Sequence, residues 1–400
     1  MQLELFANDN PASQIQLEDL FNAYYNCRRT KRGTHNAIAF EIDYESNLVG
    51  LCDEINTGRY RPGKSIAFIV DKPVKREIFA ADFRDRIVHH LIIAKLNPLF
   101  EKSFIFDSYA CRVDKGTLFG IRRVERFIRR VSRNYSEDAY ILKLDIAGFF
   151  MSIDTKILYR RLVIFIDQNY RGADKEILLE LCKIVIFSRP VDHCIIRGNR
   201  KNWQGLPDNK SLFHAKDGCG IPIGNLSSQV FANFYLNIFD HFIKNELGIR
   251  YYGRYVDDFI IVHKSKEYLA ELISVIRNYL AQELGLELHP KKIYLQHYSH
   301  GVSYLGAIIK PGRSYVANRA KGNFYSSLKI AEQDLDRLPI EALDAERRRK
   351  YVSTVNSYLG LFAHHKSYRL RRKIMSRDIK GWWRYVYAGG GLTKVTIRKY

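Results

Sequence analysis

The sequence predicts an α+β fold in which short strands are interspersed with longer helices. Residues 250–262 read as two aromatic and β-branched strands joined by a bend at Val256-Asp257-Asp258. Residues 231–242 instead carry apolar side chains at i, i+3, i+4, i+7, i+8 and i+11, the period of a buried helix face. With 46% apolar residues among 400, the chain is long enough for two or three domains with their own cores.

Helices dominate the first hundred residues. Residues 1–32 start polar and lead into a short amphipathic helix over 17–25. Apolar residues at near-helical spacing predict a second helix over 41–54, and a long helix follows over 82–100.

A basic β-hairpin separates the last two of these helices. Residues 66–70 and 75–79 form its strands, and Lys72, Lys75 and Arg76 lie near its tip. Basic side chains on a protruding hairpin either bind the phosphates of a nucleotide or are simply solvated. The residues alone leave both interpretations open.

Just before the hairpin, Gly58-Arg-Tyr-Arg-Pro-Gly-Lys-Ser65 matches the phosphate-loop pattern G-x-x-x-x-G-K-[ST]. That loop requires a strand before it and a helix after it, so that the amides at the helix start face the phosphates. Here a helix precedes the segment and a strand follows it. The sequence therefore predicts a turn at this place and no nucleoside-triphosphatase loop.

A basic turn over 110–117 contains Arg112 and Lys115 and leads into an arginine-rich helix. Three arginines recur on one face of that helix at i, i+4 and i+7: Arg122, Arg126 and Arg129. Such a face either is solvated or contacts nucleic-acid phosphates.

Residues 140–144 form an apolar strand that delivers Asp145 at its end. An ionised aspartate just beyond a buried strand either caps the next helix or binds a ligand. Residues 156–188, which follow, are mostly helical.

Residues 189–220 form a linker rich in Gly, Asn and Lys, with little periodicity. It ends in a turn that contains Ile223 and Gly224 and feeds the helix over 231–242. A glycine at this place allows the backbone to approach a ligand closely.

The last third of the chain is strongly basic. A helix over 269–284 and a strand pair at 302–306 precede basic helices over 320–387. The last hundred residues hold 21 Lys and Arg against 7 Asp and Glu, in a chain whose net charge is +21. A surplus of this size indicates a polyanionic partner such as nucleic acid.

The sequence gives no sign of a membrane protein or of a secreted one. No apolar run approaches the length of a transmembrane helix, and the N-terminus lacks a signal-peptide pattern. Six cysteines are scattered without a Cys-x-x-Cys pair, which disfavours a zinc or redox site. We therefore expect a cytoplasmic protein with reduced thiols and no membrane partner.

Three aspartates lie at a strand end or in a bend. Asp145 ends a strand, and Asp257 and Asp258 lie in the bend between two strands. Adjacent carboxylates repel each other unless a cation lies between them. Nucleotidyl transfer uses two Mg²⁺ ions, and Mg²⁺ takes oxygen ligands with one or two carboxylates per ion. One aspartate from a first strand and two from a later hairpin are the minimal protein ligands for that chemistry.

The order of these segments resembles the reverse transcriptases over about residues 15–390. Residues 144–153 (Leu-Asp-Ile-Ala-Gly-Phe-Phe-Met-Ser-Ile) are similar to their first palm motif, and Tyr255-Val-Asp-Asp258 is similar to their second. Pro222-Ile-Gly224 stands where they carry a nucleotide-contacting turn, and Lys292 and Leu305-Gly306 match the elements that follow.

The resemblance implies a right-hand polymerase fold with fingers, palm and thumb. Its expected parts are an N-terminal extension over 1–32, fingers over 33–140, a palm over 141–308 that includes the linker 189–220, and a helical thumb with a basic C-terminal segment over 309–400.

The resemblance also implies a role for particular residues. The catalytic aspartates and metal ligands are Asp145, Asp257 and Asp258, with Ile146 as a further ligand, for two Mg²⁺ ions that Mn²⁺ can replace. Phe150 stands at the family's steric gate against a ribose 2′-hydroxyl, so deoxynucleoside triphosphates are the expected substrates. The other expected nucleotide contacts are Ile223, Gly224, Arg76, Lys72 and Lys292, with Lys291 as an alternative to Lys292. The expected nucleic-acid contacts are Arg112, Lys115, Gly306, Arg371, Arg372 and Lys373.

One departure narrows the resemblance. Most reverse transcriptases have Gln where this chain has Ile223, and the string Ile221-Pro-Ile-Gly-Asn-Leu-Ser-Ser-Gln229 is similar to that of diversity-generating retroelements. The resemblance implies a bacterial or phage-encoded enzyme that copies a template-repeat RNA with errors opposite adenines. It also implies a cDNA–RNA hybrid and a basic oligomeric accessory variability protein as partners.

Two alternatives remain at this stage. One is a reverse transcriptase of a retron or an antiviral defence system. A near-repeat of DNA beside the gene, differing from its partner mainly at adenines, would exclude this alternative. The other is a non-catalytic, basic RNA-binding scaffold, against which the three intact aspartates argue.

Overall fold

The computed structural model describes residues 13–29, 33–71, 74–337, 345–383 and 386–398. The chain divides into two compact units, and their ranges interleave along the sequence. Unit 1 comprises Met1–Arg112, Leu144–Phe259 and Glu271–Ile293, and unit 2 comprises Val113–Lys143, Ile260–Ala270 and Tyr294–Tyr400. Strands and helices mix in both, so the expected α+β fold class is confirmed.

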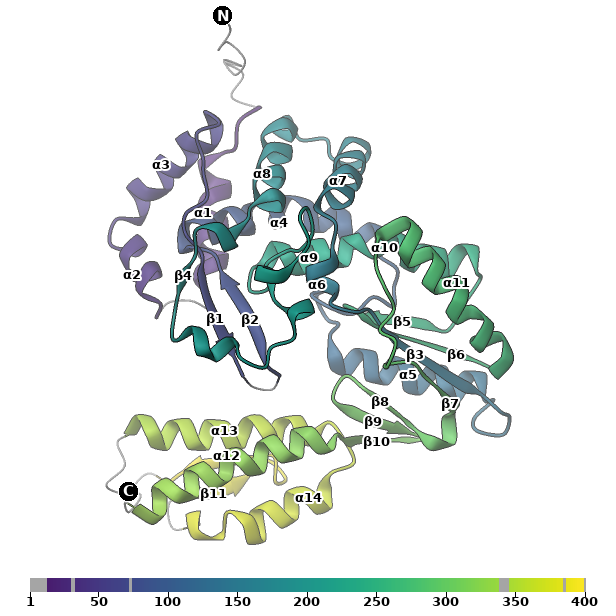
Figure 1. The fold of residues 1–400 in the computed structure, drawn as a ribbon. Helices are drawn as coiled ribbons and strands as arrows, with labels where there is room; N and C mark the ends of the chain where they lie inside the picture. The colour runs from purple at the N-terminus through teal and green to yellow at the C-terminus, as the bar shows by residue number, and fades with distance from the viewer. Residues whose placement is uncertain (1–12, 30–32, 72–73, 338–344, 384–385, 399–400) are drawn as a thin grey trace, which may run out of the picture. The chain divides into compact units, whose positions relative to one another are not determined.

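Unit 1 is built around the long helix α4, with other helices packed on it (Figure 1). Its helices are α1 (Leu17–Arg28), α2 (His35–Glu41), α3 (Tyr44–Asn56), α4 (Phe83–Ser103), α6 (Phe149–Ser152), α7 (Thr155–Asn169), α8 (Lys175–Phe187), α9 (Leu226–Tyr235) and α10 (Asn237–His241). The Asp82 side chain caps α4 by accepting a hydrogen bond from Arg84 N. Phe100 of α4 contacts the rings of Phe165 and Phe234, at centroid distances of 5.3 and 4.9 Å, and so joins α4 to α7 and α9.

A three-stranded sheet in the same unit contains the predicted basic hairpin. Strands β1 (Ile66–Val70) and β2 (Arg76–Ala80) are antiparallel, and β4 (Ile195–Ile196) adds to β1 in parallel. The aperiodic linker therefore contains a short strand that the sequence did not reveal, because two residues are too few to show a period.

The segment that matches the phosphate-loop pattern is a turn, as predicted. It precedes strand β1, and its polar groups are already paired within the protein. Asp85 of α4 accepts hydrogen bonds from the Tyr60 hydroxyl at 2.9 Å and from Gly63 N at 2.8 Å. A backbone amide that a phosphate would need is thus occupied by a buried carboxylate.

A four-stranded sheet has the order β5-β6-β3-β7. Its strands are β3 (Tyr140–Asp145), β5 (Tyr252–Tyr255), β6 (Asp258–His263) and β7 (Tyr294–His297), and helix α11 (Lys266–Leu284) follows β6. Because β3 and β6 are neighbours, the end of β3 and the start of β6 meet at the same sheet although they are far apart in sequence.

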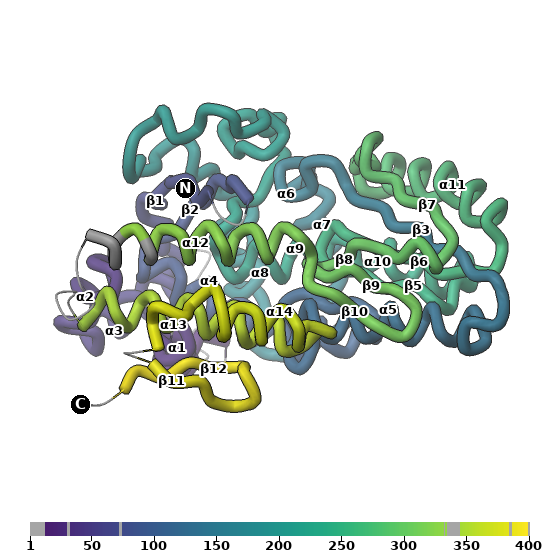
Figure 2. Tube along the Cα trace, turned by 90° about the horizontal axis from the view of Figure 1, so that it is seen from below, coloured from purple at the N-terminus to yellow at the C-terminus, as the bar shows by residue number. Residues whose placement is uncertain are grey.

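Unit 2 contains helix α5, a three-stranded meander and a helical bundle. Its elements are α5 (Thr117–Val131), β8 (Val302–Tyr304), β9 (Ala307–Lys310), β10 (Arg313–Val316), α12 (Asn318–Arg337), α13 (Ala345–Ala363), α14 (Tyr368–Lys373), β11 (Val386–Gly389) and β12 (Lys394–Ile397). Helices α12 and α13 lie side by side in both views (Figures 1 and 2). Helix α5 buries its apolar face and leaves Arg122, Arg126 and Arg129 exposed, as their spacing predicts.

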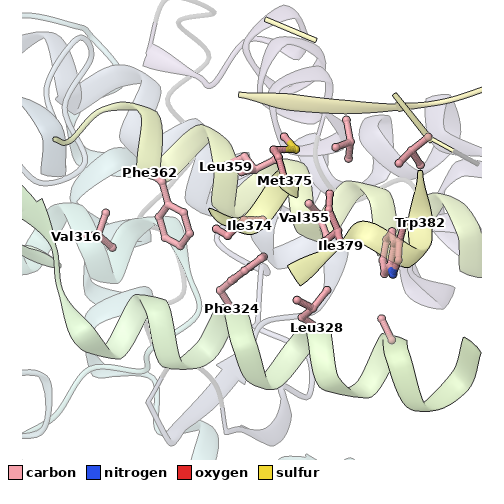
Figure 3. Packing of buried hydrophobic residues seen from close by; sticks show 13 residues of the cluster. Val316, Phe324, Leu328, Val355, Leu359, Phe362, Ile374, Met375, Ile379 and Trp382 are labelled. Carbon is pink, nitrogen blue, oxygen red and sulfur yellow. The ribbon is translucent and has the colours of Figure 1, made fainter. Parts of the chain in front are cut away.

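The bundle has its own apolar core. Phe324 and Leu328 of α12 face Val355, Leu359 and Phe362 of α13, and residues from α14 onward close the cluster (Figure 3). The rings of Phe324 and Phe362 meet edge to face at 5.7 Å. This core makes the basic helices a packed structure rather than a loose tail.

Two expectations about secondary structure differ from the structure at their ends. The helix expected over 41–54 is present as α3, which begins at Tyr44, and Glu41 instead ends α2. The expected all-helical stretch over 320–387 ends in the hairpin of β11 and β12. Asn356 of α13 explains that strand pair, since its side chain donates to Val395 O and accepts from Val395 N, at 2.8 and 2.7 Å.

Candidate active site

The bend that carries the two adjacent aspartates is a tight two-residue turn. Strand β5 ends at Tyr255 and β6 begins at Asp258, as the sequence predicts. Val256 adopts a φ of +57°, in the left-handed region that a β-branched residue rarely enters. Strain of this kind persists only where the surrounding structure enforces it.

Arg254 is the group that enforces this turn. Its side chain is fully buried, and its guanidinium binds Asp240 of α10 with Nε–Oδ1 at 2.7 Å and Nη2–Oδ2 at 2.5 Å. Nη1 also donates to the carbonyl oxygen of Val256 at 3.0 Å. Sequence reasoning missed Arg254. Its signal was a lone arginine in a strand of aromatic and aliphatic residues, together with an aspartate, Asp240, in the preceding helix but outside its apolar stripe.

Asp145 lies at the end of β3, beside β6 (Figure 1). It is 8% exposed, and one of its carboxylate oxygens accepts a hydrogen bond from Lys292 Nζ at 2.8 Å. The ammonium of Lys292, rather than that of Lys291, therefore meets the aspartate.

Asp145 and Asp258 act electrostatically on Asp257. Burial, the charge of Asp145 and the charge of Asp258 together raise the pKa of Asp257 to about 6, against the opposing effect of Lys292. A carboxyl group whose ionisation is opposed by two others has a strong affinity for a cation. The structure thus brings Asp145, Asp257, Asp258 and Lys292 into one site.

The carboxylate oxygens of these residues are the kind of ligand that a divalent ion such as Mg²⁺ takes. In the described part of the chain, no three His, Cys, Asp or Glu side chains lie close enough together to hold a metal ion by themselves. Lys292 supplies positive charge at Asp145 in the arrangement seen here. Mg²⁺ takes only one or two protein carboxylates and completes its shell with water and phosphate oxygens, so the oxygen donors present suit it.

The backbone carbonyl of Ile146, an expected metal ligand, is not used in pairing with the neighbouring segment 287–289. Ile146 forms an antiparallel bridge with Leu288, flanked by hydrogen bonds from His289 N to Asp145 O and from Ala147 N to Glu287 O, both 2.8 Å. Successive carbonyls of a strand point to opposite sides. The Ile146 carbonyl therefore points away from residues 287–289.

Phe150 and Ile223 come together although 73 positions separate them in the sequence. Both are partly buried against one apolar cluster, whose members include Phe79 of β2 and Met151 of α6. The backbone connects them as well, since Ile221 N donates to Phe150 O at 2.9 Å. The two residues expected to contact the sugar and the base pair thus pack on the same apolar cluster.

Gly224 approaches protein backbone closely. It has a φ of +130°, and a Cβ at this position would lie 3.0 Å from Phe79 O and 2.8 Å from a methyl of Ile78. Phe79 N also donates to Ile223 O at 2.8 Å. The glycine therefore allows this turn to dock onto β2, a requirement that the sequence alone could not separate from contact with a ligand.

Arg76 lies on β2 with an exposed side chain. Its charge reaches the second palm motif: burial and Cys111 raise the pKa of Tyr255, and the guanidinium of Arg76 opposes that rise. Lys72, its expected companion, lies outside the described residues.

Arg112 has an internal role. Its side chain is 6% exposed, it pairs with Glu101 at 2.8 Å, and it donates to the carbonyl oxygens of Ile105 and Ser108 at 2.7 and 3.0 Å. This geometry disfavours contact with nucleic acid, because the guanidinium already holds the turn over 105–112 together.

The remaining expected contacts belong to unit 2. Lys115 lies over the ring of Phe119, and Gly306 shares the β8–β9 turn with Leu305, both with positive φ. Arg371 donates to Gly391 O at 2.9 Å and thereby holds the C-terminal hairpin. Arg372 and Lys373 are exposed on α14.

Comparison with known proteins points to one family. The model of the family "Reverse transcriptase (RNA-dependent DNA polymerase)" matches residues 71–309. Protein YkfC of Escherichia coli (strain K12) is 21% identical over 290 residues, which cover 64% of this chain and 69% of YkfC. A protein named for intron 2 of COX1/OXI3 in Saccharomyces cerevisiae is 20% identical over 347 residues, which cover 72% of this chain and 37% of that protein.

Among solved structures, telomerase from Candida albicans in complex with the TWJ fragment of telomeric RNA aligns with a TM-score of 0.48 and 13% identity. The alignment covers 87% of this chain and 60% of the telomerase chain. The chain thus spans less than two thirds of the telomerase and of the yeast protein.

In the described residues, no helix is long and apolar enough to cross a membrane.

The family match covers more than half of the chain and includes Asp145, Asp257 and Asp258. The chain therefore belongs to the reverse transcriptase family of RNA-directed DNA polymerases.

Proposed function

We propose that this chain makes error-prone cDNA from the template-repeat RNA of a diversity-generating retroelement, with Asp145, Asp257 and Asp258 as its catalytic aspartates. The observation that carries the catalytic assignment is the raised pKa of Asp257, which the charges of Asp145 and Asp258 help to cause. A carboxylate whose ionisation two neighbouring carboxylates oppose is suited to receive a cation.

These residues would hold two divalent ions, of the kind that reverse transcriptases use, and the carbonyl of Ile146 is a further oxygen donor. When bound, such ions lower the pKa of an attacking 3′-hydroxyl and neutralise charge on the departing pyrophosphate. Lys292, which pairs with Asp145, would turn its ammonium to the phosphates of a bound nucleotide. Arg76 would bind phosphate oxygens with its planar guanidinium.

Phe150 and Ile223 select the nucleotide in this proposal. An aromatic ring beneath the sugar excludes a 2′-hydroxyl by volume, which favours deoxynucleoside triphosphates. A branched apolar side chain at Ile223 cannot donate or accept the hydrogen bonds of an amide. The geometric check of the base pair is therefore looser, and adenine templates are copied with errors.

Sequencing of cDNA made on a defined RNA tests activity and fidelity together. The purified chain, with Mg²⁺ and the basic accessory protein, is expected to make DNA with substitutions concentrated opposite template adenines. The double variant Asp257→Ala, Asp258→Ala is expected to make none. Failure of the wild-type chain to make DNA under these conditions would favour a non-catalytic RNA-binding scaffold.

The variant Ile223→Gln tests the basis of infidelity. It is expected to lower the error frequency at adenines while DNA synthesis continues. An unchanged error frequency would reject the role of Ile223. Accurate synthesis by the wild-type chain would instead favour a retron or defence-system reverse transcriptase.

A further inference from the structure

Glu77 of β2 is a buried acid with an unusual set of partners. It is 1% exposed, and it accepts hydrogen bonds from Trp203 Nε1 at 2.7 Å, Ser211 Oγ at 2.7 Å and Leu212 N at 2.5 Å. All three donors belong to residues 189–220, which we call the insertion. Burial of a carboxylate costs free energy unless hydrogen-bond donors replace the lost water. Because the acceptor is charged, its hydrogen bonds to those donors are strong.

The insertion is attached to the hairpin of β1 and β2 at further points. Ile195 N donates to Ser65 O at 2.8 Å, which starts the parallel pairing of β4 with β1. Lys75 Nζ donates to Gln204 O at 2.7 Å. The insertion therefore adds a strand to the hairpin, and the two form one sheet.

The other side of the insertion contacts helix α6, which carries Phe150. Gly148 begins this helix with a φ of +53°, and a Cβ there would lie 2.6 Å from the carbonyl oxygen of Asn209 in the insertion. Such an approach is open only to glycine.

The interior of this assembly is the apolar cluster on which Phe150 and Ile223 pack. Its core is Ala67, Phe79, Met151 and Leu212. The insertion supplies Leu212 of this core and most of the side chains around it: Val191, Cys194, Ile196, Trp203 and Ala215. Because packed interiors transmit displacements, a shift of the insertion moves both residues.

We propose that the insertion is a brace that sets the positions of Phe150 and Ile223, and that Glu77 is the positioning residue that anchors it. The effect on nucleotide selection rests on the proposed function. The effect on local packing does not. A side chain that discriminates by shape works only if its support holds it within a fraction of an ångström.

The variant Glu77→Gln tests the anchor. The amide keeps the size of the side chain, but its NH₂ cannot accept a hydrogen bond, so it must displace at least one of the donors. Asp208→Asn is the matched control, because it makes the same chemical change in the insertion at a side chain that is 84% exposed. Ser211→Ala removes one donor only, and it serves if Glu77→Gln does not fold.

The readout is the ratio of kcat/KM for a deoxynucleoside triphosphate to that for the matching ribonucleoside triphosphate. Glu77→Gln is expected to lower this ratio by about tenfold, the effect of one charge-assisted hydrogen bond. Asp208→Asn is expected to leave it unchanged. If kcat/KM falls by the same factor for both nucleotides, the ratio is unchanged and the proposal is overturned, because a merely structural role lowers both values together.

A second readout does not depend on activity. Amide hydrogen exchange over 149–152 and 221–224 is expected to quicken in Glu77→Gln and Ser211→Ala but not in Asp208→Asn. If the wild-type chain incorporates neither nucleotide, the proposed function fails and this measurement alone decides the brace. Equal exchange in all variants would reject it.

Discussion

A single carboxylate, that of Asp257, is held among groups of like charge. Its raised pKa means that the folded chain binds more protons than the unfolded chain between pH 3.8 and about 6. Stability therefore falls as the pH rises through this window, and at neutral pH the ionised group opposes folding. A bound cation would remove that opposition, so metal binding and stability are linked at this residue.

This linkage predicts that Asp257→Asn stabilises the metal-free protein at neutral pH. Free energies of unfolding measured with urea and a chelator are expected to rise by about 1–2 kcal/mol at pH 7 and by less at pH 4, where the wild-type carboxyl is largely protonated. An equal rise at both pH values would mean that the charge is not the cause.

At the scale of elements, the strained turn between β5 and β6 depends on residues outside it. Arg254 joins the Val256 carbonyl to Asp240, and Asn233 of α9 lies on the same network, accepting from Arg254 at 3.3 Å. The turn is therefore held by helices α9 and α10 and not by its own residues. Its geometry should be sensitive to substitutions that leave the three aspartates intact.

Substitution of Arg254 tests that dependence. Arg254→Met leaves the buried Asp240 without its cationic partner, although the Tyr252 hydroxyl still donates to it. The free energy of unfolding is expected to fall by about 3–5 kcal/mol. Arg254→Lys keeps the charge but loses the planar fork, so kcat is expected to fall while template affinity is unchanged. Arg250→Lys, at an exposed position two residues before β5, is the control. Equal kcat in Arg254→Lys and the control would contradict the role of the fork.

Two glycines separate the effect of close packing from that of backbone conformation. Gly306→Ala, with open space around the new methyl, is expected to cost about 1 kcal/mol through its φ of +84° alone. Gly224→Ala adds an overlap with β2 and is expected to cost about 2–4 kcal/mol. Urea denaturation of the two variants measures both. Equal losses would show that β2 yields to the methyl.

At the scale of the whole molecule, the exposed basic side chains of unit 2 take no part in its apolar core. Unit 2 has a complete apolar core, so basic side chains on the outside of its helices are not required for folding (Figure 3). Arg372 and Lys373 are exposed, whereas the neighbouring Arg371 is tied to the C-terminal hairpin. The same helix thus carries a group for structure and two exposed basic groups that we propose as contacts to nucleic acid.

Salt dependence of RNA binding distinguishes these groups. The double variant Arg372→Gln, Lys373→Gln is expected to lower the slope of log affinity against log salt by about 2, one for each lost phosphate contact. Arg371→Gln is expected to reduce the thermal stability of the chain instead. An unchanged slope in the double variant would place the nucleic acid elsewhere.

Much of the site was accessible from local pattern. Asp145 follows an apolar strand, and Asp257 and Asp258 stand in a bend between two β-branched runs. Both features lie within a few residues of sequence, and the structure has strands at both places. The fingers, palm and thumb boundaries and the residue roles carried over by resemblance remain predictions.

Local patterns were enough to identify the family, the strand ends that present the three aspartates and the basic surplus of the C-terminal segment, because each is a pattern of neighbouring residues. The folded chain was needed to show that Lys292 meets Asp145, that Arg254 holds the turn, that Arg112 faces inward and that Glu77 binds the insertion. Each of these is a contact of specific geometry. The insertion and Glu77, for example, lie more than a hundred positions apart, and no periodicity along the chain records such a distance.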